Sequence, residues 1–313
     1  MKSILAIGEC MMELSHHSDN LLKRSFAGDT YNALVYAKRY NKKLDCKYLT
    51  AIGEDAISGE MLNVLRQHDL NSQCVIASTN ATIGIYAIHT DSNGERSFSY
   101  WRNQSAATQM MKLMSLEQMV SKIGHVDSVF FSGITLGILS DEDKHLLLSL
   151  INTLRENGSQ IVFDPNYRPA MWRGTIHATQ WINLAYGHSD IVLPGIEEHQ
   201  TLFNHQSPIQ IMQHCQDLNV KEIVVKCGEL GTYVYQYGEL IFHQPFIPAE
   251  QQVDSTAAGD SFAGTYLAAR LSGFDIEGAL IDAANIARQV VQHTGAIINQ
   301  KNYQSVATLT SST

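Results

Sequence analysis

The chain has 313 residues, of which 44% are hydrophobic and 17% are charged, and its formal net charge is −9. So few charged residues exclude a disordered, charge-dominated chain, and the negative balance disfavours non-specific binding to the phosphates of a nucleic acid. The length fits one large α/β domain with an appendage, or two domains. No apolar run approaches the ~20 residues of a membrane span, and no secretory cleavage pattern follows the N-terminus. We therefore expect a cytoplasmic protein that binds neither membranes nor nucleic acid.

The cysteines are expected to be free thiols. They are odd in number, widely spaced and include no Cys-x-x-Cys pair, which argues against a disulfide framework and a structural zinc site. We expect them to be buried and reduced. They are Cys10, Cys46, Cys74, Cys215 and Cys227.

Strand-like and helix-like patterns alternate along most of the chain. A short apolar run at residues 4–7 is expected to form a buried strand, and Thr30 is expected to cap a helix that runs to about Arg39. A strand at 47–51 and a helix that starts at Ser58 follow. Further strands are expected at 129–132, 160–164, 191–194 and 222–226. This alternation is typical of parallel strands joined by crossover helices, so we predict a three-layer α/β/α sandwich around a central, mostly parallel sheet.

Residues 82–101 break this alternation. Two β-rich runs, 82–89 and 96–101, are joined by Asp91-Ser92-Asn93-Gly94, and Asn-Gly is a strong hairpin signal. The segment is therefore predicted to be antiparallel β structure inserted into the α/β body. It is either an edge hairpin of the main sheet or a small lid over a site.

The stretch from Asp254 to Gly264 is the best candidate for a phosphate site. Small residues at 257–259 let the backbone approach a ligand closely, and a helical pattern begins directly after them. A tight turn that opens a helix points unpaired N–H groups and the positive end of the helix dipole at one place, which suits an anion. Asp260 lies in the first turn of this helix. It either complements the dipole or accepts a proton from a hydroxyl that attacks a phosphate.

Competing phosphate and metal motifs are missing from the sequence. Gly259 and Gly264 have the spacing of a Walker A loop, but Thr265-Tyr266 replaces its Lys and Ser or Thr, and no Gly-x-Gly-x-x-Gly follows the first strand. No His-Glu-x-x-His motif is present and the histidines are scattered, so a histidine metal cluster is not expected.

Three further clusters carry polar side chains at the ends of predicted elements. Asp29 and Asn32 follow Gly28 at the start of the first long helix, where they either form a turn and cap or hold hydroxyl groups of a polyol. Arg102 follows the hairpin, and Arg168 lies shortly after a predicted strand. Since α/β sheets bind ligands at the carboxyl ends of their strands, arginine there suits a carboxylate or a phosphate, although each can also form an ordinary surface ion pair.

These stretches together resemble the ribokinase-like sugar kinases of the phosphofructokinase-B type. The run 254–264 resembles the C-terminal signature of that family, in which the aspartate that matches Asp260 is the catalytic base. Gly8-Glu9 and the runs 28–32 and 225–231 match in order and spacing, so the resemblance covers nearly the whole chain. It implies ATP and Mg²⁺ as cofactors, and a monovalent cation such as K⁺ is a further expectation.

Within the family, the chain resembles the subgroup that phosphorylates 2-keto-3-deoxygluconate. The likeness lies in residues 8–15, in Gly28-Asp29-Thr30, and in the runs 100–103 and 164–169. It implies transfer of the ATP γ-phosphate to the terminal 6-hydroxyl of an acidic keto-sugar, whose carboxylate would account for both arginines. A kinase of a neutral sugar such as fructose or ribose, or of a nucleoside, is the alternative.

The resemblance also implies roles for individual residues. Asp260 would be the base, and Gly259 would steady the developing charge. The residues implied to face the sugar acid are Gly28, Asp29, Thr30, Tyr31, Asn32, Tyr86, Tyr100, Trp101, Arg102 and Arg168. The residues implied to face ATP are Asn166, Tyr167, Arg168, Lys226, Cys227, Gly228, Glu229, Leu230, Gly231, Ala257, Ala258, Gly259, Asp260 and Asn285.

The resemblance also bears on the magnesium-linked motif and on the domain organisation of the chain. Glu198 matches the acidic residue of an Asn-x-x-Glu motif tied to Mg²⁺, but Gly195 replaces the asparagine, so an indirect role is expected. Residues 1–313 would form one kinase domain whose β lid comes largely from about 82–102 and part of 9–19. Such lids often mediate dimerisation in this family, so a homo-oligomer through the lid is expected.

Overall fold

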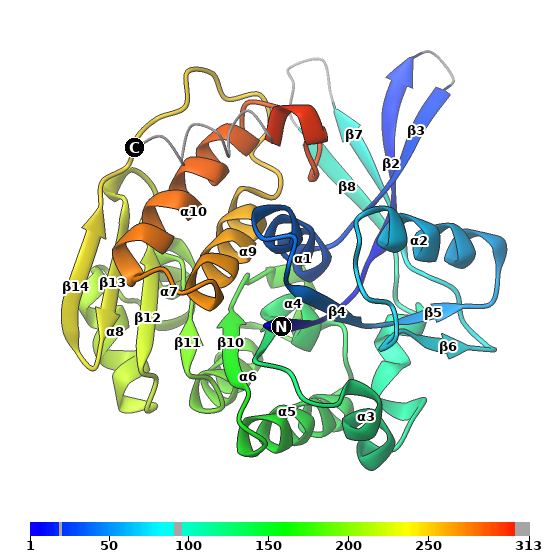
Figure 1. Ribbon diagram of the computed structural model, residues 1–313, viewed down its shortest axis with the longest axis horizontal. Coiled ribbons are helices and arrows are strands. Elements are labelled where there is room, and N and C mark those ends of the chain that lie inside the picture. Colours follow the sequence, from blue (N-terminus) through cyan, green and yellow to red (C-terminus); the bar gives the residue numbers. More distant parts are fainter. Residues whose placement is uncertain (19–20, 91–95, 304–313) are drawn as a thin grey trace.

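The computed structural model describes residues 1–18, 21–90 and 96–303. The strands of its main sheet are β1 (Ser3–Ile7), β4 (Asp45–Leu49), β9 (Ser128–Ser132), β10 (Gln160–Asp164), β11 (Ile191–Val192), β12 (Glu222–Lys226), β13 (Thr232–Gln236) and β14 (Glu239–Gln244). Their order in space is β14-β13-β12-β11-β10-β9-β1-β4 (Figure 1). The six strands from β12 to β4 are parallel, while β13 and β14 are antiparallel additions at one edge. The predicted mostly parallel sheet is confirmed.

Helices cover both faces of the main sheet. On one face lie α3 (Leu116–Ile123), α4 (Gly133–Gly137), α5 (Asp141–Glu156), α6 (Thr175–Gly187), α7 (Ile196–Phe203) and α8 (Pro208–Asp217). On the other lie α1 (Asp29–Tyr40), α2 (Ala56–Gln67), α9 (Ala258–Leu271) and α10 (Ile276–Val290). Three short 3-10 turns are η1 (Ala106–Lys112), η2 (Pro169–Met171) and η3 (Gly228–Leu230).

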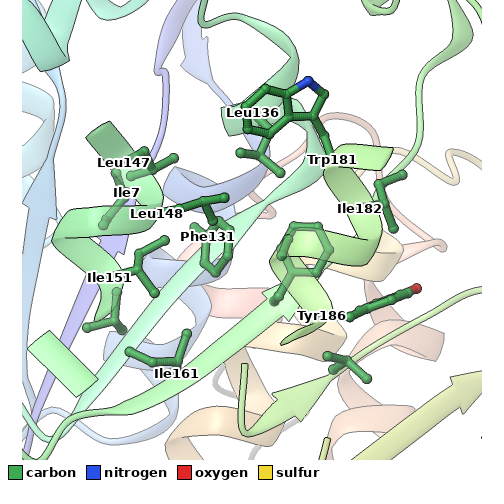
Figure 2. Close-up of a cluster of buried hydrophobic side chains, with 14 of the residues drawn as sticks. Ile7, Phe131, Leu136, Leu147, Leu148, Ile151, Ile161, Trp181, Ile182 and Tyr186 are labelled. Atoms are coloured by element: carbon green, nitrogen blue, oxygen red, sulfur yellow. The ribbon is translucent and has the colours of Figure 1, made fainter. Parts of the chain in front are cut away.

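The two faces of β1 explain why the sandwich has three layers. Leu5 and Ile7 pack with the α5 side, whereas Ile4 and Ala6 pack with the α1 and α9 side. Such alternation within an entirely apolar strand is expected where both faces of a parallel sheet are buried. Figure 2 shows part of the first cluster, in which side chains of α5 and α6 meet Phe131 of β9.

A second, smaller sheet projects beside the main body (Figure 1). Its strands are β2 (Met11–Ser18), β3 (Leu21–Ala27), β7 (Ile85–Thr90) and β8 (Arg96–Trp101), in the order β3-β2-β7-β8. The hairpin β7–β8 is therefore no edge of the main sheet, and that alternative is wrong. The strand β3 was not predicted, and the turn at 91–94 lies outside the described residues. A third sheet consists of β5 (Ala51–Gly53) and β6 (Ile76–Ser78).

Two predicted helix starts and one predicted strand are wrong in detail. Helix α1 begins one residue before Thr30, whose side chain is buried, and its N-cap residue Gly28 makes no side-chain bond. Helix α2 begins before Ser58 because Asp55 accepts hydrogen bonds from the first-turn amides and caps the helix. The predicted strand at 47–51 is divided between β4 and β5, which lie in different sheets.

The five cysteines are all buried and free, as predicted. Among the described residues, no helix is both long enough and apolar enough to cross a membrane.

Candidate active site

A cavity of about 920 Å³ lies between the carboxyl ends of the main-sheet strands and the small sheet. Its size is that of a small-molecule site. The predicted site residues that line it are Gly28, Asp29, Asn32, Tyr86, Tyr100, Arg102, Asn166, Arg168, Lys226, Ala257, Gly259 and Asp260. Helix starts and strand ends that are far apart in the sequence thus converge on one cavity.

Asp260 lies in the first turn of α9 and is held by an amide from α1. The Nδ2 of Asn32 donates a hydrogen bond of 2.8 Å to Oδ2 of Asp260. Desolvation raises the pKa of Asp260 to about 7, and the negative charge of nearby Asp29 adds to the increase. The hydrogen bond from the amide of Asn32 and the positive charge of Arg168 lower the pKa of Asp260 and so limit this increase. A carboxyl group poised near neutrality is suited to accept a proton from a substrate hydroxyl.

The turn before Asp260 forms an anion-binding helix start. Ala257 adopts the left-handed conformation, with φ of 61°, and supplies no side-chain cap to α9. The first-turn N–H groups therefore remain available to a ligand. A Cβ built on Gly259 would meet no atom within 4 Å, so the fold itself does not require glycine there. The glycine leaves room in the cavity for a ligand to approach the backbone.

A network of charges lies at the ends of β10 and β12. The Nζ of Lys226 donates to both oxygens of Asp164, at 3.0 and 2.8 Å. Asn166 follows β10 with a positive φ of 33°, and its Nδ2 donates to Asp29 at 3.0 Å. Burial alone would lower the pKa of Lys226, but Asp164 and Glu198 raise it, so the ammonium stays charged.

The two arginines have different surroundings. Arg168 is exposed and, among the described residues, forms no ion pair with a carboxylate. Arg102 is nearly buried and forms an ion pair with the buried carboxylate of Glu9, which also accepts a bond from Ser105. Both arginines line the cavity, but only Arg168 has its charge free for an anionic ligand.

Aromatic side chains of the small sheet form one wall of the cavity. The rings of Tyr86 and Tyr100 stack with their centres 5.8 Å apart, and Phe98 lies beside them. The hydroxyl of Tyr86 donates to Glu13, which also accepts from Ser25 at 2.9 Å. Glu13 therefore fixes the orientation of Tyr86.

Several predicted residues do not line the cavity. Thr30 and Tyr31 are buried in or behind α1, Tyr167 and Cys227 belong to the core, and Trp101 is 62% exposed. The others outside the lining are Glu198, Gly228, Glu229, Leu230, Gly231, Ala258 and Asn285. Leu230 and its neighbours form the exposed η3 turn after β12, and Asn285 accepts a hydrogen bond from Arg288.

Glu9, Phe98 and Asp164 are among the lining residues that sequence reasoning missed as members of the site. Asp164 could have been found, since it is an acidic residue that ends an apolar strand. Phe98 alternates with Tyr100 along β8, so the period of a strand places both on one face. Glu9 offered no such signal, because its role depends on Arg102 from a distant segment.

The acidic residues near Lys226 bear on the expected magnesium ion. The two oxygens of Glu198 accept hydrogen bonds from the backbone N–H groups of Tyr167 and Gly195, at 2.9 and 2.8 Å. Asp164 is paired with Lys226 and also lines the cavity. Magnesium bound with a nucleotide keeps several waters and takes few protein ligands. These residues fit such a role, in which Glu198 positions the backbone instead of binding the ion.

A family model for pfkB family carbohydrate kinases matches residues 1–302. The chain belongs to this family. Among curated relatives, the 2-dehydro-3-deoxygluconokinase of Escherichia coli K12 is 36% identical over 95% of this chain and 97% of its own length. The enzyme of the same name from Haemophilus influenzae is 33% identical over 96% of both chains.

Solved structures of pfkB-type kinases share the fold of this chain. The 2-dehydro-3-deoxygluconokinase of Thermotoga maritima superposes with a TM-score of 0.83 over 98% of both chains, at 19% identity. A putative ribokinase II of E. coli in complex with ATP and Mg²⁺ also has a TM-score of 0.83, at 20% identity, over 99% of this chain and 100% of its own. The family predicted from the motifs is thus confirmed, and the chain is a carbohydrate kinase.

Proposed function

We propose that this pfkB-family kinase transfers the γ-phosphoryl group of ATP to the 6-hydroxyl of 2-keto-3-deoxygluconate, giving the 6-phosphate and ADP. The observation that carries the proposal is the position of Arg168, which lines the same cavity as Asp260 and pairs with no carboxylate among the described residues. A guanidinium in that position suits the carboxylate of a sugar acid. The names of the E. coli and H. influenzae relatives support the same substrate.

Each of the cavity residues has a separate role in the proposed phosphoryl transfer. Asp260 accepts the proton of the attacking hydroxyl, while Asn32 keeps its carboxylate oriented. The first-turn N–H groups of α9, including that of Gly259, stabilise negative charge on the phosphoryl oxygens, and Lys226 in the cavity wall contributes positive charge. Asp164, which lines the cavity, would stand near Mg²⁺ bound with the nucleotide, and the ion would supply positive charge that offsets the phosphates. Closure of the small sheet would exclude water, so that ATP is not hydrolysed.

The first test is ADP release by the purified protein with ATP and Mg²⁺. The acceptors 2-keto-3-deoxygluconate, gluconate, fructose and ribose are compared at equal concentration. We expect a strong preference for the keto-deoxy acid. Preference for fructose or ribose would keep Asp260 as the base but reject the sugar acid as the substrate.

Three accompanying proposals can be tested on the same preparation. The small sheet exposes Leu21, Leu22 and Trp101, which supports its use as a lid that also joins two copies of the chain. Sedimentation of the wild-type protein beside Leu22→Lys tests this homo-oligomer. Replacement of K⁺ by a larger organic cation in the assay tests the monovalent cation. A cytoplasmic location and the absence of nucleic-acid binding stay predictions.

A further inference from the structure

A second groove, of about 760 Å³, lies between α1, α2, β3 and residues 297–300. It shares no lining residue with the cavity that holds Asp260. The charged groups in its wall are Arg24, Arg39 and Glu60, and Tyr31 and His68 also line it. The kinase reaction as derived above uses none of these side chains, so the groove needs a separate explanation.

Arg39 is the central feature of the groove. Its Nη1 donates to the backbone oxygen of Ile298 at 2.7 Å, and its guanidinium carbon lies 5.8 and 5.7 Å from the ring centres of Tyr36 and Tyr303. Its Nε is buried without a hydrogen-bond partner among the described residues, and in that part of the chain no carboxylate pairs with it. A partly buried charge without a counter-ion is costly, and an anion in the groove would offset that cost.

Two neighbours of Arg39 provide further hydrogen-bonding groups. The fully buried Tyr31 has a hydroxyl without a partner among the described residues. Arg24 pairs with Glu60 at 2.7 Å, but both side chains are nearly half exposed, and such surface pairs contribute little. Arg24 can therefore turn toward a ligand at small cost. The amide side chains of Asn63 and Gln67 line the same groove and suit hydroxyl groups.

We propose that this groove binds a small anion, a carboxylate or phosphate ester that also carries hydroxyl groups. Arg39 and Arg24 would hold the acidic group, and the buried hydroxyl of Tyr31 would donate to it. Asn63 and Gln67 would contact the hydroxyl groups of the ligand. This inference does not rest on the substrate proposed above, since the two sites share no residue.

The groove adjoins the catalytic residues through the helix α1. Tyr31 in the groove is followed directly by Asn32, whose amide holds Asp260. A ligand in contact with Tyr31 would therefore touch the residue that directly precedes Asn32, whose side chain orients the carboxylate of Asp260.

The test is an NMR titration that observes the ring protons of His68, which lie in the groove with the ring centre 6.3 Å from that of Tyr31. The resonance is assigned from the spectrum of His68→Asn. The probes are 6-phosphogluconate, gluconate and inorganic phosphate, added to the wild-type protein, Arg168→Ala and Arg39→Gln. Arg168→Ala removes charge from the catalytic cavity but leaves the groove unchanged.

We expect saturable shifts with 6-phosphogluconate in the wild type and in Arg168→Ala, and binding at least about tenfold weaker in Arg39→Gln, as for a lost charged hydrogen bond. Saturation by phosphate alone or by gluconate alone would tell which acidic group is bound. Equal affinity in Arg39→Gln, or no shift in the wild type at millimolar probe, would overturn the proposal. If Arg39→Gln does not fold, Arg24→Gln provides the comparison, because it removes the other positive charge of the groove from a half-exposed position.

Discussion

Asn32 on α1 donates a hydrogen bond of 2.8 Å to Asp260 on α9, although 228 positions separate them in the sequence. The two helices can approach so closely because Gly264 has no side chain. A Cβ there would lie 1.9 Å from the backbone oxygen of Ala33. The glycine of one helix and the amide of the other thus place the candidate base.

Replacement of Asn32 by alanine is expected to move the acidic limb of the rate–pH profile to higher pH. The amide favours the ionised form of Asp260, whose pKa of about 7 must rise when this donor is lost. On the order of tenfold lower kcat is expected at pH 7, with a smaller loss at pH 9. Asn152→Ala is the matched control, since Asn152 donates to Glu156 in an exposed pair on α5. An equal loss at every pH would assign Asn32 to substrate binding alone.

Asp260→Asn is expected to lower kcat by at least ~10²-fold without weakening the fold. Its folded-state pKa lies above the ordinary value of 3.8, so ionisation between about pH 4 and 7 destabilises the folded state. An asparagine does not ionise, so the variant avoids this destabilisation. Thermal unfolding should therefore show a larger gain of stability for the variant at pH 7.5 than at pH 4. Near-normal turnover would mean that Asp260 only complements the dipole of α9.

Two glycines of α9 are expected to respond oppositely to alanine. In Gly259→Ala, the methyl group would enter open space in the cavity, so stability should be unchanged or rise by up to ~1 kcal/mol from helix propensity. The KM for ATP should increase, because the methyl group keeps phosphate away from the first-turn N–H groups. Gly264→Ala should instead lower stability, because its Cβ would collide with α1. Thermal unfolding and ATP kinetics on both variants check this pair.

Arg168→Ala is expected to cost about 1.5–3 kcal/mol in kcat/KM for the sugar acid, and much less for a neutral acceptor. The reason is that its charge has no partner among the described residues and is left to the substrate. Parallel assays on 2-keto-3-deoxygluconate and fructose measure the difference. Equal losses would place Arg168 at the phosphates of ATP or in a structural role.

Arg102→Ala is expected to act mainly on stability. Its loss leaves the buried carboxylate of Glu9 without a counter-ion, which typically costs about 3–5 kcal/mol. Burial already raises the pKa of Glu9, and the loss of Arg102 would raise it further. Denaturant unfolding should show this loss, and Glu9→Gln combined with Arg102→Ala should recover part of it. A stable Arg102→Ala with reduced affinity for the sugar acid would favour a direct role in binding.

Local sequence patterns were enough to predict the fold class, because the alternation of apolar strands with helical patterns can be recognised within short stretches of the chain. It also located Asp260 and the helix start before it, since small residues and a helix N-terminus are adjacent in sequence. Apolar residues recur every three to four positions in a helix and every second position in a half-buried strand, so both patterns can be recognised without the tertiary structure.

Which polar groups contact one another could be learned only from the folded chain. Arg102 and Arg168 are similar in sequence context, yet Arg102 is neutralised by Glu9 from 93 positions away, whereas Arg168 pairs with no carboxylate in the part of the chain that the structure describes. The helix start at Asp29 was missed because it depends on the packing of Gly28 against the backbone of Glu9. The strand β3 was missed because it is largely exposed and its residues do not alternate between apolar and polar, so only its pairing with β2 identifies it. Charge pairing and close backbone approach depend on distances between remote residues, which local patterns do not contain.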